Sequence, residues 1–359
     1  MLKPVLKASA VLLGAGALYL TLWPVPIDPQ PWDAPQNQGY TGAFSPNTAL
    51  QAMDRIALNG EFGPEDAAIG ADGRLYMASH SGAILAYDPA DGTVSEFANT
   101  GGLPLGISAT DDGVLYIADA AKGLVQVDAA GTVTVLTNTV DGTPIDYADD
   151  LDIAPDGSIY FTDASTKFGA VANGGTFPAS FLDLMEHGGH GRVLRYDPAT
   201  GQTRVILDGL QFANGLAINA AGTHFLVIET GAYAVRRVSL DGASVETVLE
   251  NTPSFPDNIS RAPDGTFWMG FVSPRSQQAD DLAPKPFLRK LVMRLPAAMR
   301  PKATRYGLVA RISETGEVLE TLHDPDGGFA FTTGVIETAD GTKYITSLRE
   351  DTLGRLAAP

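Results

Sequence analysis

The sequence contains no cysteine, which excludes disulfide bonds, thiol nucleophiles and zinc sites with thiolate ligands. It also lacks the Gly-x-Ser-x-Gly elbow, the P-loop, the G-x-G-x-x-G fingerprint and the His-Glu-x-x-His zinc motif. Basic residues are scarce: 24 Lys and Arg stand against 42 Asp and Glu, and the formal net charge is -18. Such a charge repels nucleic acid and anionic lipid headgroups, so we expect neither as a partner.

One apolar run without charge stands out at the N-terminus. Lys3 and Lys7 precede an uncharged stretch from Ala8 to Pro26 that is rich in Leu, Val, Ala and Gly. A positive flank before such a run keeps the N-terminus in the cytoplasm and directs the downstream chain to the other side of the membrane. The pattern predicts an N-terminal transmembrane helix that anchors the protein in a membrane. A cleaved signal peptide, with Ala15–Ala17 as its small-residue site, and a buried helix are the alternatives.

These features divide the chain into three parts. Residues 1–24 are the membrane anchor or signal segment, residues 25–40 form a stiff Pro-rich linker, and residues 41–359 form one folded domain. We expect that domain on the exported, periplasmic or extracytoplasmic side. The sequence does not indicate the oligomeric state.

A turn followed by an aromatic strand recurs six times in the folded domain. The copies are Asp72–Tyr76, Asp112–Tyr116, Asp156–Tyr160, Ala221–Phe225, Asp264–Trp268 and Asp340–Tyr344. Asp-Gly between alternating apolar runs marks a hairpin, because glycine tolerates positive φ at the turn. A spacing of about 40 residues is typical of one four-stranded blade. We therefore predict an all-β fold, a six-bladed β-propeller, in which residues 53–58 supply the outer strand that the last copy lacks.

Two copies are followed by long insertions, at residues 168–189 and 273–305. The second contains a basic and apolar stretch, residues 287–295, that predicts a short helix. Insertions at fixed points of a repeat usually crown one face and shape a site there. Plain surface loops are the alternative interpretation.

The position seven residues before each turn is equivalent in all copies and marks the start of the innermost strand. It holds Glu65, Leu105, Asp149, Asn214, Asp257 and Thr333. The four oxygen-bearing side chains other than Thr333 should converge in the central channel, where carboxylates repel one another unless a cation or protons lie between them. Oxygen ligands without His or Cys favour Ca²⁺, then Mg²⁺ or Mn²⁺. Asn258 can add another oxygen, and hydrogen bonding to channel waters is the alternative.

The next position carries acids in two copies, Asp66 and Asp150. Together with a backbone carbonyl such as that of Ile107, they form a candidate second metal site deeper in the channel. Paired hydrogen bonds to the backbone would explain these acids equally well.

Several segments carry a resemblance to a known family. They are Tyr116–Leu124, Asp150–Asp152, Tyr160–Asp163, Asn214–Ala217, Phe255–Ser260 and Leu322–Gly327. From Trp23 to its end, the chain resembles the strictosidine synthase-like propellers, which are related to the gluconolactonase/senescence-marker and paraoxonase families.

The resemblance implies a channel calcium with ligands at Glu65, Asp149, Asn214, Asp257 and Asn258, although the family usually has Asn where this chain has Asp149. By the same likeness, Asp66, Asp150 and the Ile107 carbonyl match the structural calcium of paraoxonases. The catalytic residues of these families have no matching residue types in this chain. The paraoxonase His dyad falls on Leu105 and Ala120, and the Glu of plant strictosidine synthases falls in residues 329–333, which contain no acid.

We therefore predict a calcium-dependent hydrolase of lactones or esters, with Asp257 or Asp149 taking a proton from the attacking water. The apolar insertion around residues 287–295 favours a small-molecule substrate with a hydrophobic acyl or aryl group. A membrane-tethered binding propeller with a structural metal is the first alternative. A strictosidine synthase-like enzyme that condenses an amine with an aldehyde is the second, and the missing acid disfavours it.

Overall fold

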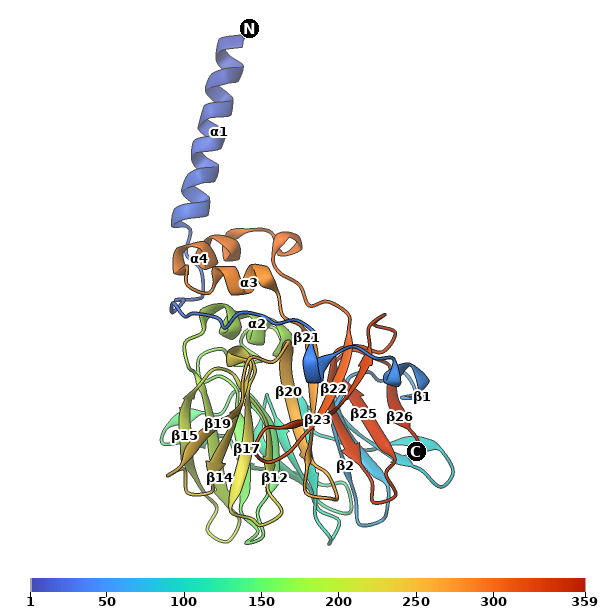
Figure 1. Cartoon of the computed structure of the whole chain (residues 1–359). Helices are drawn as coiled ribbons and strands as arrows, with labels where there is room; N and C mark the ends of the chain where they lie inside the picture. Colours follow the sequence, from blue (N-terminus) through green and yellow to red (C-terminus); the bar gives the residue numbers. More distant parts are fainter. Residues whose placement is uncertain (1, 359) are drawn as a thin grey trace.

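The protein is a six-bladed β-propeller with a helical cap on one face (Figure 1). The computed structural model describes the backbone of residues 2–358 and the side chains of residues 12–358. Five blades take their four antiparallel strands consecutively from the chain. The first blade comprises β2 (Pro64–Ile69), β3 (Leu75–Ser79), β4 (Ala83–Asp88) and β5 (Thr93–Asn99), and the second comprises β6 (Pro104–Ala109), β7 (Leu115–Asp119), β8 (Gly123–Val127) and β9 (Val133–Thr137). The third comprises β12 (Ala148–Ile153), β13 (Ile159–Asp163), β14 (Gly191–Asp197) and β15 (Gln202–Leu210), and the fourth comprises β16 (Ala213–Ile218), β17 (His224–Glu229), β18 (Ala234–Ser239) and β19 (Val245–Leu249). The fifth comprises β20 (Ser254–Arg261), β21 (Phe267–Pro274), β22 (Gly307–Ile312) and β23 (Val318–Asp324).

The sixth blade joins the two ends of the domain. It holds β24 (Thr332–Glu337), β25 (Lys343–Ser347), β26 (Thr352–Leu356) and, as its outer strand, β1 (Asp54–Ala57). β1 pairs antiparallel with β26, with Ile56 opposite Leu353. The predicted closure by residues 53–58 is confirmed, and it leaves no unpaired gap between the first and last blades.

Each innermost strand contacts the innermost strand of the next blade, and β24 contacts β2, so the ring is complete. The hairpin turns have the geometry that the repeat predicted, with φ of 79° at Gly73 and 81° at Gly157. Buried apolar side chains fill the space between neighbouring blades, for example Phe267 and Met269 of β21 against Ile228 of β17. A short two-stranded hairpin, β10 (Thr139–Val140) and β11 (Thr143–Pro144), lies outside the blades.

Three helices from the two predicted insertions cap one face of the propeller (Figure 1). They are α2 (Thr176–Glu186), α3 (Gln277–Leu282) and α4 (Pro286–Arg294). The short helix predicted at residues 287–295 is therefore confirmed. Short 3-10 turns complete the set of helices: η1 (Gly42–Phe44), η2 (Ala49–Ala52), η3 (Thr230–Ala232) and η4 (Ala297–Met299).

An N-terminal helix, α1 (Leu2–Leu22), projects from the same face as the cap (Figure 1). The sequence predicted that this helix spans a membrane. Among the residues that the structure describes, none of the helices has both the length and the apolarity needed to cross a bilayer, so this part of the prediction is not confirmed. The side chains of Lys3 and Lys7, which suggested the orientation, lie outside the described residues.

The Pro-rich linker is held against the cap instead of standing free. The Asp28 N–H donates to Glu186 Oε2 at 2.7 Å, and the Gln30 N–H donates to the Glu186 carbonyl at 2.8 Å. Farther along, the Trp32 N–H donates to the carbonyl of Ala283 at 3.3 Å. The linker is therefore part of the wall above the channel.

Candidate metal centre

All six innermost strands carry a β-bulge at the same place. The pairing with the second strand shifts between Pro64 and Ala67 in the first blade and between Ala148 and Leu151 in the third, and the other blades repeat this pattern. A bulge leaves residues unpaired and redirects their side chains, and bulges are common next to active sites. The two bulged positions are those that the sequence singled out, so this backbone feature explains why these side chains turn into the channel.

Five predicted ligands each have a buried oxygen without a hydrogen-bond partner among the described residues. These atoms are Glu65 Oε2, Asp149 Oδ1, Asn214 Oδ1, Asp257 Oδ2 and Asn258 Oδ1. Buried polar atoms are nearly always satisfied, and an orphaned one needs an explanation such as a missing ion. Only ten side-chain atoms of the described residues are orphaned in this way. Half of them belong to this one set, which indicates that these oxygens bind a further partner that is not part of the protein.

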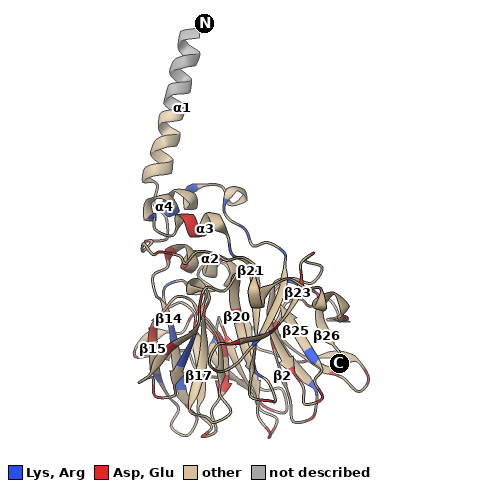
Figure 2. Cartoon of the chain, viewed as in Figure 1, with Lys and Arg blue, Asp and Glu red and all other residues tan. Residues whose placement is uncertain are grey.

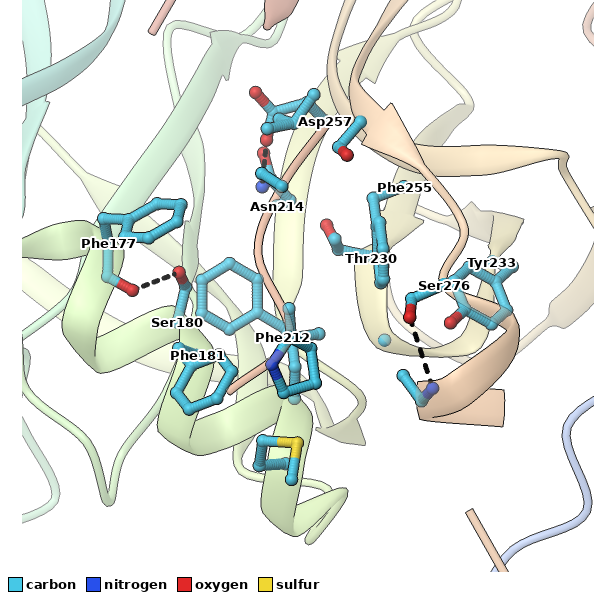
Figure 3. A pocket seen from close by; sticks show the side chains of 18 of the residues that line it. Phe177, Ser180, Phe181, Phe212, Asn214, Thr230, Tyr233, Phe255, Asp257 and Ser276 are labelled. Carbon is cyan, nitrogen blue, oxygen red and sulfur yellow. Dashed lines mark hydrogen bonds between the residues drawn. The ribbon is translucent and has the colours of Figure 1, made fainter. Parts of the chain in front are cut away.

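The centre comes from blades one, three, four and five. Asn214 Nδ2 donates to Asp257 Oδ1 at 2.6 Å, which joins the fourth and fifth blades (Figure 3). Asn258 Nδ2 donates to the backbone carbonyl of Glu65 at 3.0 Å, which joins the fifth blade to the first. Both amides thus use their nitrogen on the protein and leave their oxygen unpartnered, as a cation ligand would require.

Burial raises the pKa values of the three central carboxyls, and repulsion between charges adds to the rise for Glu65 and Asp149. Desolvation contributes most to the raised pKa of Glu65, followed by the charges of Asp149 and Asp257. Desolvation and the charge of Asp257 likewise raise the pKa of Asp149. The pKa of Asp257 rises to about 7 through desolvation, against the lowering effect of its hydrogen bond from Asn214. These groups therefore bind protons, or a cation in their place, near neutral pH.

The acidic side chains of the centre do not by themselves form a metal site. Within residues 12–358, no three His, Cys, Asp or Glu side chains form a group able to hold a metal ion. The proposed ligand set, however, has three carboxylates and two amides, and amide oxygens are ordinary ligands of hard cations. The orphaned oxygens and the shared charge are the observations that fit an ion here; calcium itself remains a proposal.

The candidate second site is occupied by backbone hydrogen bonds. Asp66 Oδ2 accepts the Ile107 N–H at 3.0 Å, and Asp150 accepts the N–H groups of Leu216 at 2.7 Å and Leu151 at 2.8 Å. The prediction named the carbonyl of Ile107, whereas the contact in the structure is made by its N–H. Asp66 thus links the first blade to the second, and Asp150 links the third blade to the fourth. Such hydrogen bonds to the backbone are the alternative to a metal site that the sequence left open. A second ion at this position stays a prediction.

The other two equivalent positions complete the channel without charge. Leu105 is buried and apolar, and the Thr333 hydroxyl contacts that of Thr346 at 2.7 Å. Sequence reasoning missed His80, whose Nε2 lies 3.7 Å from Glu65 Oε2. His80 lies eight residues after Asp72, at a position that holds Ala120 and Ala164 in the next two copies, so the repeat gave no sign of a functional residue there. Burial lowers the pKa of His80, which favours its neutral form beside the carboxylate.

An apolar pocket of about 180 Å³ lies directly against the centre (Figure 3). Its lining includes Glu65, Asp149, Asn214 and Asp257, and it includes aromatic rings from the cap and the channel: Phe177, Phe181, Phe212, Tyr233 and Phe255. The two insertions therefore shape a site, as predicted. The sequence did not identify α2, although Phe177, Phe181 and Leu184 follow the three-and-four spacing of a helical face.

The linker supplies one further wall residue. Trp32 lines the pocket and stacks on His187 with ring centroids 3.9 Å apart and planes 5° from parallel. His187 itself is buried at the end of α2. A tryptophan in a Pro-rich segment gave no sequence signal for this role, because the contact depends on how the linker crosses the cap.

The chain is similar to known proteins over most of its length. Residues 149–243 match the family described as strictosidine synthase, and residues 42–87 match the family described as strictosidine synthase-like, N-terminal. The human adipocyte plasma membrane-associated protein is 32% identical over 96% of this chain and 86% of its own length. An Arabidopsis thaliana protein named strictosidine synthase-like 13 is 36% identical over 63% of this chain and 57% of its own length.

Solved structures share the fold at lower sequence identity. A gluconolactonase from Xanthomonas campestris has a TM-score of 0.63 at 19% identity, covering 92% of this chain and 97% of the other. Regucalcin from Agrobacterium tumefaciens, described as a calcium-binding protein, has a TM-score of 0.56 at 15% identity, covering 85% and 94%. Likeness at this level establishes the propeller architecture.

Proposed function

Because the chain belongs to the strictosidine synthase-like family of six-bladed propellers, we propose that it is a calcium-dependent hydrolase of lactones or esters with hydrophobic acyl or aryl groups. One observation carries the proposal: five buried oxygens have no hydrogen-bond partner among the described residues, and four of the side chains that carry them line an aromatic pocket. Two proteins of the same fold have names that agree with the proposal: a gluconolactonase agrees with lactone hydrolysis, and a calcium-binding regucalcin agrees with a calcium site.

The ligands would be Glu65, Asp149, Asn214, Asp257 and Asn258. A bound calcium would polarise the substrate carbonyl and stabilise the negative charge that develops on its oxygen. Asp257 would take a proton from water and return it to the leaving alcohol, and Asp149 is the alternative base. The aromatic walls hold the apolar part of the substrate and exclude bulk water from the reacting bond.

A binding propeller with a structural metal is the second candidate. The specific observation in its favour is that Leu105 and Ala120, where the paraoxonase dyad would lie, are buried apolar residues. The condensing reaction is disfavoured because Phe329 to Thr333 form a buried segment without an acid.

Hydrolysis by the full chain distinguishes these functions. A panel of aryl esters and lactones would be assayed with added calcium and with chelator. The proposal expects turnover that chelator abolishes and that Asp257→Ala and Glu65→Ala reduce by at least about a hundredfold, since each removes a calcium ligand and the first also removes the proposed base. Asp91→Ala, at an exposed turn, is the matched control. Absence of turnover on every substrate, with calcium still raising the melting temperature, would favour the binding propeller.

We also propose that α1 attaches the protein to a membrane, with the propeller on the exported side. Two observations support this attachment. The described part of α1 exposes Leu12, Leu13, Leu18 and Leu22, and the mammalian relatives are named as plasma membrane-associated proteins. Flotation of the full chain with lipid vesicles, compared with a form that starts at Pro24, tests the attachment.

A further inference from the structure

Basic residues are concentrated in one segment of this acidic chain. Residues 285–305 contain seven of the 24 Lys and Arg residues and no Asp or Glu. They are Lys285, Arg289, Lys290, Arg294, Arg300, Lys302 and Arg305. The segment comprises α4, η4 and the chain that returns to β22, and Figure 2 shows blue residues along it. A net charge of -18 for the whole chain therefore conceals one strongly cationic segment.

Few of these charges are neutralised by acids. Among the described residues, Lys290 pairs with Asp28 and Arg305 pairs with Glu350, and the other five form no ion pair. Three of those five are arginines that donate to backbone carbonyls instead. Arg289 reaches the carbonyls of Met185 and Ala283, for example, at 3.1 and 2.9 Å. A carbonyl accepts hydrogen bonds but leaves the positive charge in place, and Arg289 Nε is buried without a partner among the described residues.

α4 differs from an ordinary surface helix in the charges that it buries. Besides the apolar Met293, it buries Arg289 and Arg294, which are 2% and 8% exposed, and it presents Phe287 and Leu288, which are 54% and 38% exposed. Just beyond it, Met299 is 66% exposed. Scattered exposed apolar residues are normal, but a short helix that buries its charges and exposes its aromatic side chain marks a surface for an apolar partner.

α4 also holds the base of α1. Arg294 Nε donates to the Trp23 carbonyl at 2.6 Å, and its Nη1 donates to the Leu20 carbonyl at 3.1 Å. These carbonyls end α1, so the arginine caps the helix and fixes it next to α4. Both elements lie on the same face of the propeller (Figure 1). Any membrane that α1 enters must therefore lie close to the exposed side of α4.

We propose that a cap face, made of Phe287, Leu288, Met299, Lys285 and Lys302, docks on the surface of an anionic lipid bilayer. The apolar side chains enter the headgroup region, and the two lysines, which have no ion pair among the described residues, bind the lipid charges. This contact goes beyond the attachment by α1, because it places the propeller itself against the bilayer.

The docking determines how the pocket is approached. Lys302 and Arg289 of the basic segment belong to the pocket lining, as do residues of α2 and α3. The pocket therefore lies beside the cap face, and an apolar substrate dissolved in the lipid reaches it without crossing bulk water. In this respect the proposal deepens the hydrolase function, on which this last step rests, but its test needs no turnover.

The absence of native cysteine allows a direct test. Phe287→Cys in the full chain would be labelled with an environment-sensitive fluorophore and mixed with vesicles of zwitterionic lipid alone or with added anionic lipid. We expect a blue shift and quenching by lipid-borne quenchers, both stronger with anionic lipid. The matched control is Leu319→Cys, on a blade edge that is 47% exposed. Adding Lys285→Gln and Lys302→Gln should remove the preference for anionic lipid.

Two outcomes would overturn the proposal. One is a label at position 287 that stays in water on vesicle-bound protein, as the label at position 319 should. The other is a shielded label without vesicles whose signal rises with protein concentration, because a second copy of the chain would then cover the face. Either result leaves the hydrolase proposal untouched, since esterase activity is measured separately.

Discussion

Replacing Asp257 by Asn tests whether the buried negative charge of the central channel destabilises the protein. The test depends on whether the substitution raises or lowers stability. Most substitutions of buried polar residues destabilise a protein, but this one should stabilise the metal-free form. The amide has the size of the carboxylate, and its oxygen can still accept the hydrogen bond from Asn214. It removes one of three carboxyls that repel one another in a buried site.

The size of the effect follows from the pKa of Asp257. Its pKa is about 7 in the folded protein against an ordinary value of 3.8. As pH rises from 3.8 to 7, the unfolded chain loses this proton while the folded protein retains it, so folding becomes less favourable over that range. Above pH 7 the cost is complete and amounts to about 4 kcal/mol. For a chain of this length, that corresponds to roughly 5 °C in melting temperature.

Thermal melts at about pH 5 and pH 8, each with chelator and with calcium, measure this effect. With chelator at the higher pH, Asp257→Asn should melt above the wild type, and the difference should shrink at the lower pH. Calcium should raise the melting temperature of the wild type but have much less effect on the variant. Asp280→Asn is the control, because Asp280 is also buried but pairs with Arg275 at 2.8 Å, and its loss should destabilise the protein. A destabilised Asp257→Asn in chelator at the higher pH would refute the reasoning.

Further substitutions test the cap and the blade contacts. Trp32→Ala should raise KM several-fold for esters with long apolar acyl groups and leave acetyl esters unchanged, whereas the exposed Trp23→Ala should change neither in steady-state kinetics. Asp150→Ala leaves two buried backbone N–H groups, including that of Leu216, without an acceptor, and should lower the free energy of unfolding in urea by about 3 kcal/mol. Arg294→Ala should speed proteolysis at residues 20–24 without changing the melting temperature of the propeller; equal cleavage rates would contradict its role as the cap of α1.

The propeller was predictable because its signals are local and repeated. Asp72-Gly73 and its five counterparts specify hairpins through the positive φ of glycine, and the closure by β1 followed from counting strands. The convergence of these side chains on the channel was predictable for the same reason, since equal offsets in equal repeats give equal places in space. The six coincident bulges explain physically why that rule identified Glu65 and Asp257.

The cap was predictable only in part. The basic and apolar pattern of residues 287–295 gave α4, but nothing local specified that Arg289 and Arg294 would be the buried side. Binary patterning assumes that charges face solvent, and here backbone carbonyls of other segments satisfy them. Trp32 was missed because its contact with His187 is long-range and lies outside the repeat. His80 was missed because the equivalent positions in the next two copies hold alanine. For Ile107, the N–H contacts Asp66, and the predicted role of its carbonyl as a metal ligand stays a prediction.

The charge count of the centre gives Asp149 a particular part in the proposed chemistry. Glu65, Asp149 and Asp257 carry three negative charges when ionised, and the nearby Arg192 is already engaged by Asp163. A divalent ion balances only two charges, so a proton on one of the three carboxyls is the remaining means of neutralising the buried site. With Asn in place of Asp149, which the resemblance implies is usual in the family, two carboxylates would match the ion and no such proton would be held. In the proposed chemistry, a proton held by Asp149 would leave Asp257 ionised, which is what a carboxyl that takes a proton from water requires.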